Sequence, residues 1–217
     1  MVEVVIPTKN DYLELEKILG VLKFFSRISR IVIVDNASSP QISSLIQNIC
    51  SQNNCHYVYC ATPGKGNALQ KGIQETEGDV LFLDADIENL SLEMVFSFLE
   101  KSSFDLVKAT FKRKNGQSNS AFILDAFQKQ FPQLSLSRPT SGLYFVKRTV
   151  LQNLQIPPSW SADLSILLQA YQQGFSITEI DLGIIEDKPR SFASLLESKK
   201  CLEEEFHMEV LKHGKCI

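Results

Sequence analysis

Residues 79–86 read Asp79-Val80-Leu81-Phe82-Leu83-Asp84-Ala85-Asp86, an apolar run that ends in two carboxylates. The apolar run predicts a buried strand, because short runs of this kind are typical of strands covered on both faces. Side chains alternate along a strand, so Asp84 and Asp86 share a face at its end. Two carboxylates held close together repel each other unless a cation lies beside them. The pair predicts a site for a divalent cation that also binds phosphates; the alternative is a surface turn before a helix near Ser91.

Similar apolar runs recur along the first half of the chain and alternate with helical patterns. Strands are predicted at residues 2–6, 31–34, 56–60 and 79–83, and helices at 15–25 (capped by Asn10 or Asp11), 42–50 and 67–76. Such alternation predicts an α/β fold, a mostly parallel sheet flanked by helices. Ligands of these sheets bind at the carboxyl ends of the strands. We expect four such ends to meet at one edge: Pro7-Thr8, Asp35, Gly64-Lys65 and Asp84 with Asp86.

The second half of the chain shows a more mixed pattern. Strands are predicted at 104–111, 142–146 and 176–182, and helices at 121–131, 162–173 and from residue 191 onward. No internal repeat, low-complexity tract or linker interrupts the chain. We therefore expect one domain that spans residues 1–217.

The composition narrows the class of protein. A length of 217 residues with 44% hydrophobic residues supports a real core, and a net charge of -3 argues against a nucleic-acid surface. Met1 leads directly into a predicted strand, which leaves no room for a signal peptide, and no apolar run is long enough for a transmembrane segment. We expect a cytoplasmic protein with reduced thiols, because its cysteines are odd in number and lack metal-ligand spacing: Cys50, Cys55, Cys60, Cys201 and Cys216.

Two of the strand ends carry groups that suit a nucleotide. The glycines of Gly64-Lys65-Gly66 let the backbone approach a ligand closely, and the lysine can meet its negative charge. The spacing is neither that of a P-loop nor that of a dinucleotide-binding fingerprint, and a plain strand-to-helix turn is the alternative. Asp35 can accept hydrogen bonds from a ribose or a base, or it can cap the helix that follows.

Three further charged residues can belong to a site or to the surface. Lys108 and Arg113 lie near the end of a predicted strand, where they can meet phosphate or remain solvated. Asp163 opens a predicted helix, where a carboxylate is favourable even without any further role.

The order and spacing of four segments resemble those of a known family, the GT-A, family 2-like nucleotide-sugar glycosyltransferases. The segments are Val5-Ile6-Pro7-Thr8-Lys9-Asn10, Ile33-Val34-Asp35-Asn36-Ala37-Ser38, Pro63-Gly64-Lys65-Gly66-Asn67-Ala68 and Leu83-Asp84-Ala85-Asp86. Two later segments are similar to glucosyl-3-phosphoglycerate synthase-like enzymes: residues 105–111 with Arg113, and Arg138-Pro139-Thr140-Ser141-Gly142. The resemblance implies a GT-A (Rossmann-like) domain with a nucleotide-sugar half at 1–110, an acceptor half at 111–190 and a C-terminal helix at 191–217.

The resemblance also implies an activity and a donor site. The chain would be a metal-dependent hexosyltransferase that moves a sugar from a nucleoside diphosphate to a small hydroxyl-bearing acceptor. A Mg²⁺ or Mn²⁺ ion would offset the charge that develops on the leaving diphosphate. Pro7, Thr8 and Asp35 would hold the nucleoside, and Gly64 and Lys65 would contact the phosphates. Asp84 would lie near the ribose and the metal, and Asp86 would bind the metal.

The residues that the resemblance implies for the acceptor site match the family pattern less closely than those of the donor site. Ser141 and Gly142 would face the donor sugar and the acceptor, but Leu143 stands where the synthases carry an acidic residue. Asp163 would be the catalytic base of an inverting reaction, or would orient the acceptor in a retaining one. Asp187 stands where the relatives carry a metal-binding histidine, and an exposed loop charge beside Lys188 is the alternative.

Two other functions remain open. The chain could be a non-catalytic or regulatory nucleotide-sugar binder, since Leu143 departs from the synthase pattern. A sugar-nucleotide pyrophosphorylase would carry a glycine-rich loop directly after the first strand, where this chain has Pro7-Thr8-Lys9-Asn10. A homodimer is also compatible with this resemblance.

Overall fold

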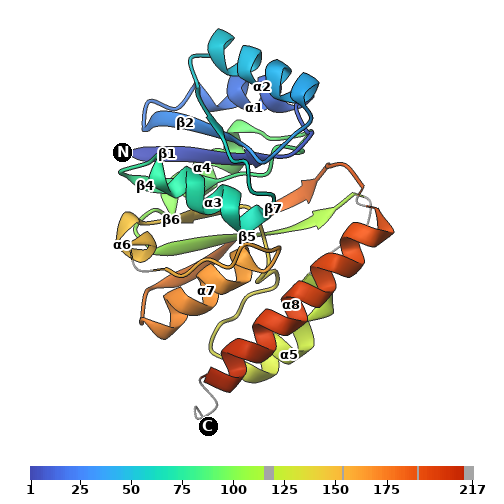
Figure 1. Cartoon of the computed structure of the whole chain (residues 1–217). Helices are drawn as coiled ribbons and strands as arrows, with labels where there is room; N and C mark the ends of the chain where they lie inside the picture. The colour runs from blue at the N-terminus through green and yellow to red at the C-terminus, as the bar shows by residue number, and fades with distance from the viewer. Residues whose placement is uncertain (115–119, 153, 190, 213–217) are drawn as a thin grey trace.

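The structure is a computed structural model that describes residues 1–114, 120–152, 154–189 and 191–212. Its centre is a seven-stranded sheet in the order β3-β2-β1-β4-β6-β5-β7, with helices on both faces (Figure 1). β6 runs antiparallel to both of its neighbours, and the other pairings are parallel. The expected α/β fold with a mostly parallel sheet is therefore confirmed.

The elements follow the predicted order. The strands are β1 (Val2–Thr8), β2 (Ile28–Asp35), β3 (His56–Tyr59), β4 (Asp79–Phe82), β5 (Leu106–Arg113), β6 (Tyr144–Val146) and β7 (Ile177–Ile185). The helices are α1 (Leu15–Leu22), α2 (Pro40–Gln52), α3 (Lys65–Gln74), α4 (Leu92–Glu100), η1 (Ser120–Phe122), α5 (Leu124–Gln130), α6 (Arg148–Leu151), α7 (Ala162–Gln172) and α8 (Phe192–Lys212).

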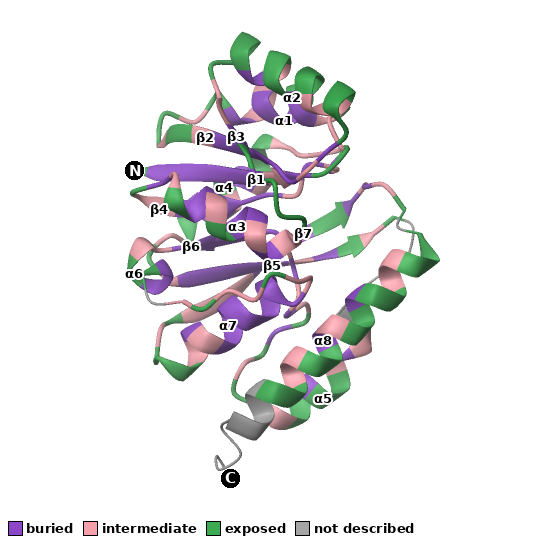
Figure 2. Cartoon of the chain, viewed as in Figure 1, coloured by how far each residue is buried: buried purple, intermediate pink, exposed green. Residues whose placement is uncertain are grey.

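Alternation along the strands divides the core into two clusters, one on each face of the sheet. In β1, Val5 joins the cluster beneath α3 and α7, whereas Val4 and Ile6 join the cluster beneath α1, α2 and α4. Figure 2 shows the strands buried between these layers. A sheet buried on both faces fixes the positions of its strand ends, which is what a precise site at its edge requires.

The strand order reverses beside β1. β2 and β3 lie on one side of β1, and β4 lies on the other, so the loops that leave β1 and β4 diverge. Thr8 pairs with Asp35 at the carboxyl ends of β1 and β2, and Val5 pairs with Phe82 close to the end of β4. A crevice for ligands forms at such a switch point.

The late part of the chain returns to this edge. The segment after β7 forms an isolated bridge between Asp187 and Ile87, and the Glu88 amide donates to the Glu186 carbonyl at 2.8 Å. α8 then crosses back over α7, and its Phe206 ring packs edge-on against Phe131, with 6.2 Å between the centroids. Residues 100 positions apart thus meet beside the predicted carboxylate pair.

Two local predictions are decided by the structure. A helix begins near Ser91, as expected, and Ser91 caps this helix, α4, because its Oγ accepts from the Met94 amide at 3.3 Å. The predicted cap of the first helix at Asn10 or Asp11 is wrong, because α1 begins at Leu15 after Glu14. Asn10 instead has a left-handed φ of 59° and lies in a loop.

The described residues bear on two expectations from the composition, those on membrane-spanning segments and on the cysteines. None of the described helices combines the length and the apolar composition that a membrane crossing requires. Four of the five cysteines are described, and all four are free thiols; Cys216 lies outside the described residues.

Candidate active site

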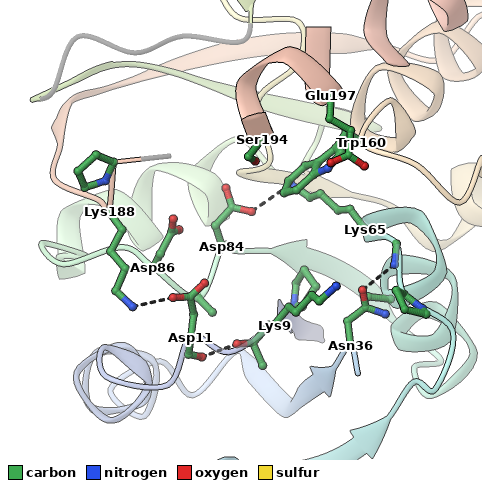
Figure 3. Close-up of a pocket in the computed structure, with 17 residues that line it drawn as sticks. Lys9, Asp11, Asn36, Lys65, Asp84, Asp86, Trp160, Lys188, Ser194 and Glu197 are labelled. Carbon is green, nitrogen blue, oxygen red and sulfur yellow. Dashed lines mark hydrogen bonds and ion pairs between the residues drawn. The ribbon is translucent and has the colours of Figure 1, made fainter. Parts of the chain in front are cut away.

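A cavity of about 520 Å³ opens at the carboxyl ends of β1, β2 and β4 (Figure 3). Segments from six separate parts of the chain line it. The lining residues are Pro7, Thr8, Lys9, Asp11, Asn36, Pro63, Gly64, Lys65, Ala68, Asp84, Ala85, Asp86, Trp160, Lys188, Pro189, Ser194 and Glu197. Of the expected strand-end residues, all but Asp35 therefore share one cavity.

Lys65 joins two carboxylates at the floor of this region. Its Nζ lies 3.1 Å from Asp84 Oδ1 and 2.8 Å from Asp163 Oδ2, and the three side chains are 10%, 17% and 5% exposed. The lysine comes from the first residue of α3, Asp84 from the end of β4, and Asp163 from the first turn of α7. The fold thus brings together three residues that the sequence placed in separate motifs.

The loop before β6 lies directly on this group. A Cβ at Gly142 would lie 2.5 Å from Lys65 Nζ and 2.7 Å from Asp84 Oδ2, so a larger residue there would displace the ends of these two side chains. Ser141 is buried, and its Oγ interacts with the backbone of Leu143. Gly142 thus lies against Lys65 and Asp84, and the predicted contact of Ser141 and Gly142 with the donor sugar and the acceptor stays a prediction.

Lys108 lies beneath the site: it lines neither cavity, where a phosphate would bind, and it is not solvated, so both alternatives of the sequence interpretation are wrong. Its side chain is buried, and Nζ donates to the carbonyl oxygens of Ser141 at 2.6 Å and Asp163 at 3.4 Å. The ammonium also lies 4.3 Å from the centre of the Tyr144 ring. Burial lowers the pKa of Lys108 to about 8, partly offset by the Asp163 carboxylate.

Two buried oxygens remain beside this lysine. Asp163 Oδ1 and the Tyr144 hydroxyl have no hydrogen-bond partner among the residues that the structure describes. Burial raises the pKa of Tyr144 well above its usual range, and the Asp163 carboxylate adds to the effect. Buried polar atoms are normally satisfied, and the Tyr144 hydroxyl is placed to donate to the Asp163 carboxylate, so these two oxygens can serve each other.

Asp35 faces the protein interior. It is fully buried and accepts from the Ser38 amide at 3.0 Å, Ser43 Oγ at 2.5 Å and Tyr57 Oη at 3.0 Å. These bonds hold the loop before α2, but the N-cap of α2 is Ser39, without a side-chain cap, so the alternative that Asp35 caps this helix is wrong. A contact between Asp35 and a nucleoside stays a prediction, and the neighbouring Asn36 is the residue that lines the cavity.

The glycines at the start of α3 approach the protein's own backbone. Gly64 has a φ of 136°, and a Cβ at Gly66 would lie 1.7 Å from the Pro157 carbonyl oxygen. The Gly66 amide donates to the Pro158 carbonyl at 3.1 Å, and the Gly64 amide donates to Asn36 Oδ1 at 2.8 Å. Their first role is therefore to seat α3 against the segment that leads into α7.

The metal prediction rests on few protein ligands. Asp84 and Asp86 both line the cavity, but no group of three or more His, Cys, Asp or Glu side chains in the described part of the chain could hold a metal ion. Asp187 is 9% exposed and forms an ion pair with Arg113. Two carboxylate donors fit Mg²⁺ or Mn²⁺, since such ions are often held by one or two carboxylates together with substrate phosphates.

A smaller cavity adjoins the first on the side of β5. It is lined by Lys65, Asp84, Phe111, Arg113, Arg138, Thr140, Ser141, Gly142, Trp160, Asp163 and Leu202. The Arg138 guanidinium lies 4.2 Å from the Phe111 ring centre, and burial together with the charge of Arg113 lowers the pKa of Arg138 to about 10. Glu179 holds this loop through the backbone amides of Ser137 and Arg138, each at 3.0 Å.

Sequence reasoning did not identify four of the lining residues as functional. Asn36 stands beside Asp35 in a recognised motif, so its amide could have been found from the motif itself. Trp160 and Lys188 carry no local pattern; Lys188 reaches Asp11 at 2.6 Å across 177 positions of sequence. Glu197 belongs to a helix whose placement depends on the whole fold.

The fold and this edge define a class of protein: an α/β enzyme with a charged cavity at the carboxyl ends of its parallel strands. The model of glycosyl transferase family 2 matches residues 3–157. The chain belongs to that family, which confirms the expected family and reaction class.

Curated relatives include glucosyl-3-phosphoglycerate synthase from Mycobacterium tuberculosis. It is 21% identical over 222 residues, which cover 89% of this chain and 68% of the relative. The synthase from Mycobacterium bovis matches with the same values.

Solved structures share the fold. One is the M. tuberculosis synthase in complex with Mn²⁺, uridine diphosphate and phosphoglyceric acid, with a TM-score of 0.86, 18% identity and coverage of 96% of this chain and 78% of that chain. Another, described as a mycobacterial protein, has a TM-score of 0.87, 17% identity and coverage of 96% and 74%. A further complex of the synthase contains Mg²⁺ and uridine diphosphate. The expected GT-A fold is confirmed.

Proposed function

We propose that this chain transfers a sugar from a nucleoside diphosphate to a small acceptor hydroxyl. The observation that carries the proposal is the Lys65 ammonium, which lies within 3.1 Å of both Asp84 and Asp163 where the two cavities meet. Sugar transfer requires a donor site and an acceptor site that share one reacting centre. Two adjoining cavities with common charged residues supply that arrangement.

The donor would occupy the larger cavity. Pro7, Thr8 and Asn36 border the end expected to hold the nucleoside, and Lys65 supplies a cation for the diphosphate. Asp84 and Asp86 would hold Mg²⁺ or Mn²⁺, which as a Lewis acid would offset the charge on the leaving diphosphate. The relatives' complexes with Mn²⁺ or Mg²⁺ and uridine diphosphate support this assignment.

The acceptor would bind at the smaller cavity, which has a volume of only about 20 Å³ and would have to widen, and it would carry an acidic group. Arg113 and Arg138 both lie beside Phe111 there, and the charge of Arg113 already destabilises the Arg138 cation. A phosphate or carboxylate would relieve that repulsion. The relatives crystallised with phosphoglyceric acid or glycerol 3-phosphate support an acceptor of this class.

Asp163 would orient the acceptor or the sugar. Its pairing with Lys65 at 2.8 Å and its 3% exposure favour an orienting role over that of a base that must take up a proton. Because Asp163 would orient a substrate and not act as a base, the reaction would retain the configuration of the anomeric carbon.

The proposed reaction also assigns a role to each part of the chain. Residues 1–110 would bind the nucleotide sugar, residues 111–190 the acceptor, and the helix from 191 onward would close the site. A cytoplasmic location and a homodimer stay predictions, and sedimentation of the purified chain would measure the second.

Incubation with nucleotide sugars tests the function. The chain is mixed with uridine, guanosine and adenosine diphosphate glucose, Mn²⁺ and either phosphoglycerate or glycerol 3-phosphate, and released nucleoside diphosphate is measured. Release that requires both metal and acceptor supports transfer. Binding of a donor without any release supports the alternative of a non-catalytic binder, and no binding at all overturns both.

Asp86→Ala provides the companion test of the metal assignment. Asp86 lies beyond the last residue of β4 and contributes little to the core, so the fold should persist. Calorimetry should show that Mn²⁺ strengthens nucleoside diphosphate binding to the original chain at least tenfold and to the variant by much less. Equal affinities with metal and with chelator in the original chain would remove the metal from the proposal.

A further inference from the structure

Three residues line both cavities: Lys65, Asp84 and Trp160. If the larger cavity holds the nucleoside diphosphate and the smaller holds the acceptor, the sugar in transfer must lie at this junction, because it is bonded first to one and then to the other. The inference below therefore rests on the proposed function. It concerns Trp160, to which neither the motifs nor the relatives' descriptions assign a role.

The junction has a charged side and an aromatic side. Lys65, Asp84 and the nearby Asp163 offer charged hydrogen-bonding groups, which suit the hydroxyls of a sugar. Trp160 is half-buried and is the single tryptophan of the chain. The face of an aromatic ring is electronegative, and the C–H bonds of a sugar are polarised positively by the neighbouring oxygens. A sugar ring presents both kinds of surface, so it matches both sides of the junction.

The backbone around Trp160 is held on both sides. On its N-terminal side, the Pro158 carbonyl accepts from Gly66 at the start of α3, one residue from Lys65. On its C-terminal side stands buried Ser161, two residues before Asp163. Ser161 Oγ lies 2.8 Å from Ser159 Oγ and donates to Glu205 Oε2 of α8 at 3.3 Å. Trp160 is thus anchored between the elements that supply Lys65 and Asp163, and Figure 3 shows it beside the Lys65 side chain as that chain extends toward Asp84.

We propose that Trp160 is the surface against which the transferred sugar packs. The indole would contact the C–H face of a hexose while Lys65, Asp84 and Asp163 meet its hydroxyls. Trp160 would then discriminate a nucleoside diphosphate sugar from the nucleoside diphosphate alone, because only the former carries a sugar ring that can pack against the indole.

Calorimetry on matched ligands tests the proposal. Uridine diphosphate and uridine diphosphate glucose, each with Mg²⁺, are titrated into the original chain, Trp160→Ala and Trp160→Phe; the guanosine and adenosine pairs replace them if they bind more tightly. Trp160→Ala should weaken the sugar nucleotide about tenfold and leave the nucleotide within about twofold, and Trp160→Phe should restore most of the loss. Phe96→Ala, at an exposed position on α4, is the control and should change neither affinity.

Tryptophan fluorescence gives a second measurement that needs no variant. With one tryptophan in the chain, the emission reports Trp160 directly. The sugar nucleotide should shift or quench the emission, and the nucleotide alone should change it much less. Equal changes with both ligands, or equal losses of affinity for both in Trp160→Ala, would overturn the proposal.

The two proposals fail in different ways. If no sugar nucleotide binds the original chain, the proposed function and the Trp160 contact are both overturned. If the donor binds and is turned over but neither emission nor affinity depends on the sugar at Trp160, only the Trp160 contact is overturned. If Trp160→Ala does not fold by circular dichroism, Trp160→Phe and the emission of the original chain still decide the question.

Discussion

At the scale of single residues, the site is organised by lysines whose surroundings differ. Lys65 is an ammonium between two carboxylates, with distances of 3.1 Å and 2.8 Å, so its charge is compensated. Lys108 is buried one layer below, where carbonyl oxygens and the Tyr144 ring surround it. Lys65 can therefore bind a ligand, whereas Lys108 supports the backbone at Ser141 and Asp163.

Lys65→Met should destabilise the protein and weaken donor binding. Removal of the ammonium leaves Asp84 and Asp163 facing each other in a poorly hydrated place, which should lower the free energy of unfolding by about 3 kcal/mol. The double variant Lys65→Met/Asp163→Asn should recover part of this loss, because one of the opposed charges is gone. Urea unfolding measures the stability of both variants. A Lys65→Met variant as stable as the original chain would show that the ion pairs contribute nothing to stability.

Lys108 should make stability depend on pH in the alkaline range. Its pKa in the folded protein is about 8, below the 10.5 of an exposed lysine, so between these values the unfolded chain holds a proton that the folded chain has lost. Stability must then rise with pH across this window, by about 2 kcal/mol up to pH 10, and the burial cost is fully present below pH 8.

Lys108→Met is the variant that isolates this contribution. Urea unfolding of both proteins at about pH 7.5 and pH 10 should show the original chain gaining about 2 kcal/mol relative to the variant. A difference that does not change between the two pH values would mean that the buried amine keeps an ordinary pKa.

At the scale of helices and strands, most of the fold was predictable because the strands are buried on both faces. β1, β2 and β4 appear in the sequence as short runs of apolar residues, and their hydrophobic pattern needs no tertiary information. The start of α1 was not predictable from its caps, since Glu14 makes no capping hydrogen bond. The tertiary contacts of buried Leu15 and Ile18 decide where that helix lies.

The candidate site was predictable only where a motif stands at a strand end. Asp84, Asp86 and Lys65 were found in this way, because a parallel sheet places its carboxyl ends together. Trp160 and Lys188 were missed because only the return of the late chain brings them to the cavity. Lys108 was misplaced for the same reason: only the tertiary fold covers its side chain with the Ser141 loop and the start of α7.

Gly66→Ala should disturb α3 and the segment before α7 together. The added Cβ would lie 1.7 Å from the Pro157 carbonyl oxygen, so one of the two backbones must move, at a cost of roughly 2–3 kcal/mol. Because the same segment carries Trp160, the near-ultraviolet circular dichroism of the tryptophan should change as well. Gly20→Ala in α1 is the matched control: nothing lies within 4 Å of its added methyl group, and stability should rise by about 0.5–1 kcal/mol.

At the scale of the whole molecule, contacts between the first half of the chain and the segment from β7 onward complete the cavity. Asn89 Nδ2 donates to the Ile184 carbonyl at 2.9 Å, and Lys188 pairs with Asp11 at 2.6 Å. These contacts hold Asp187 in a bridge with Ile87, next to Asp86 along the chain. Asp187 therefore reaches the neighbourhood of the carboxylate pair by topology, not by sequence proximity.

Asp187 has two possible roles that one pair of variants separates. The ion pair with Arg113 gives it a structural role, and Asp187→Ala should cost about 3 kcal/mol of stability because it leaves a poorly exposed guanidinium uncompensated. The sequence prediction adds a second role as a metal ligand, in which Arg113 competes with the metal for the carboxylate. Arg113→Met removes the competitor and retains the ligand.

Calorimetry of Mn²⁺ in the presence of uridine diphosphate should therefore move in opposite directions in the two variants. Asp187→Ala should lower the metal affinity and Arg113→Met should raise it, each by about tenfold, because one loses a carboxylate and the other frees it. Asp187→His should keep part of the affinity, since imidazole also binds Mn²⁺. If both Asp187→Ala and Arg113→Met change stability but leave metal affinity within about twofold of the original chain, Asp187 serves the ion pair alone and the metal is held by Asp84 and Asp86 with the diphosphate.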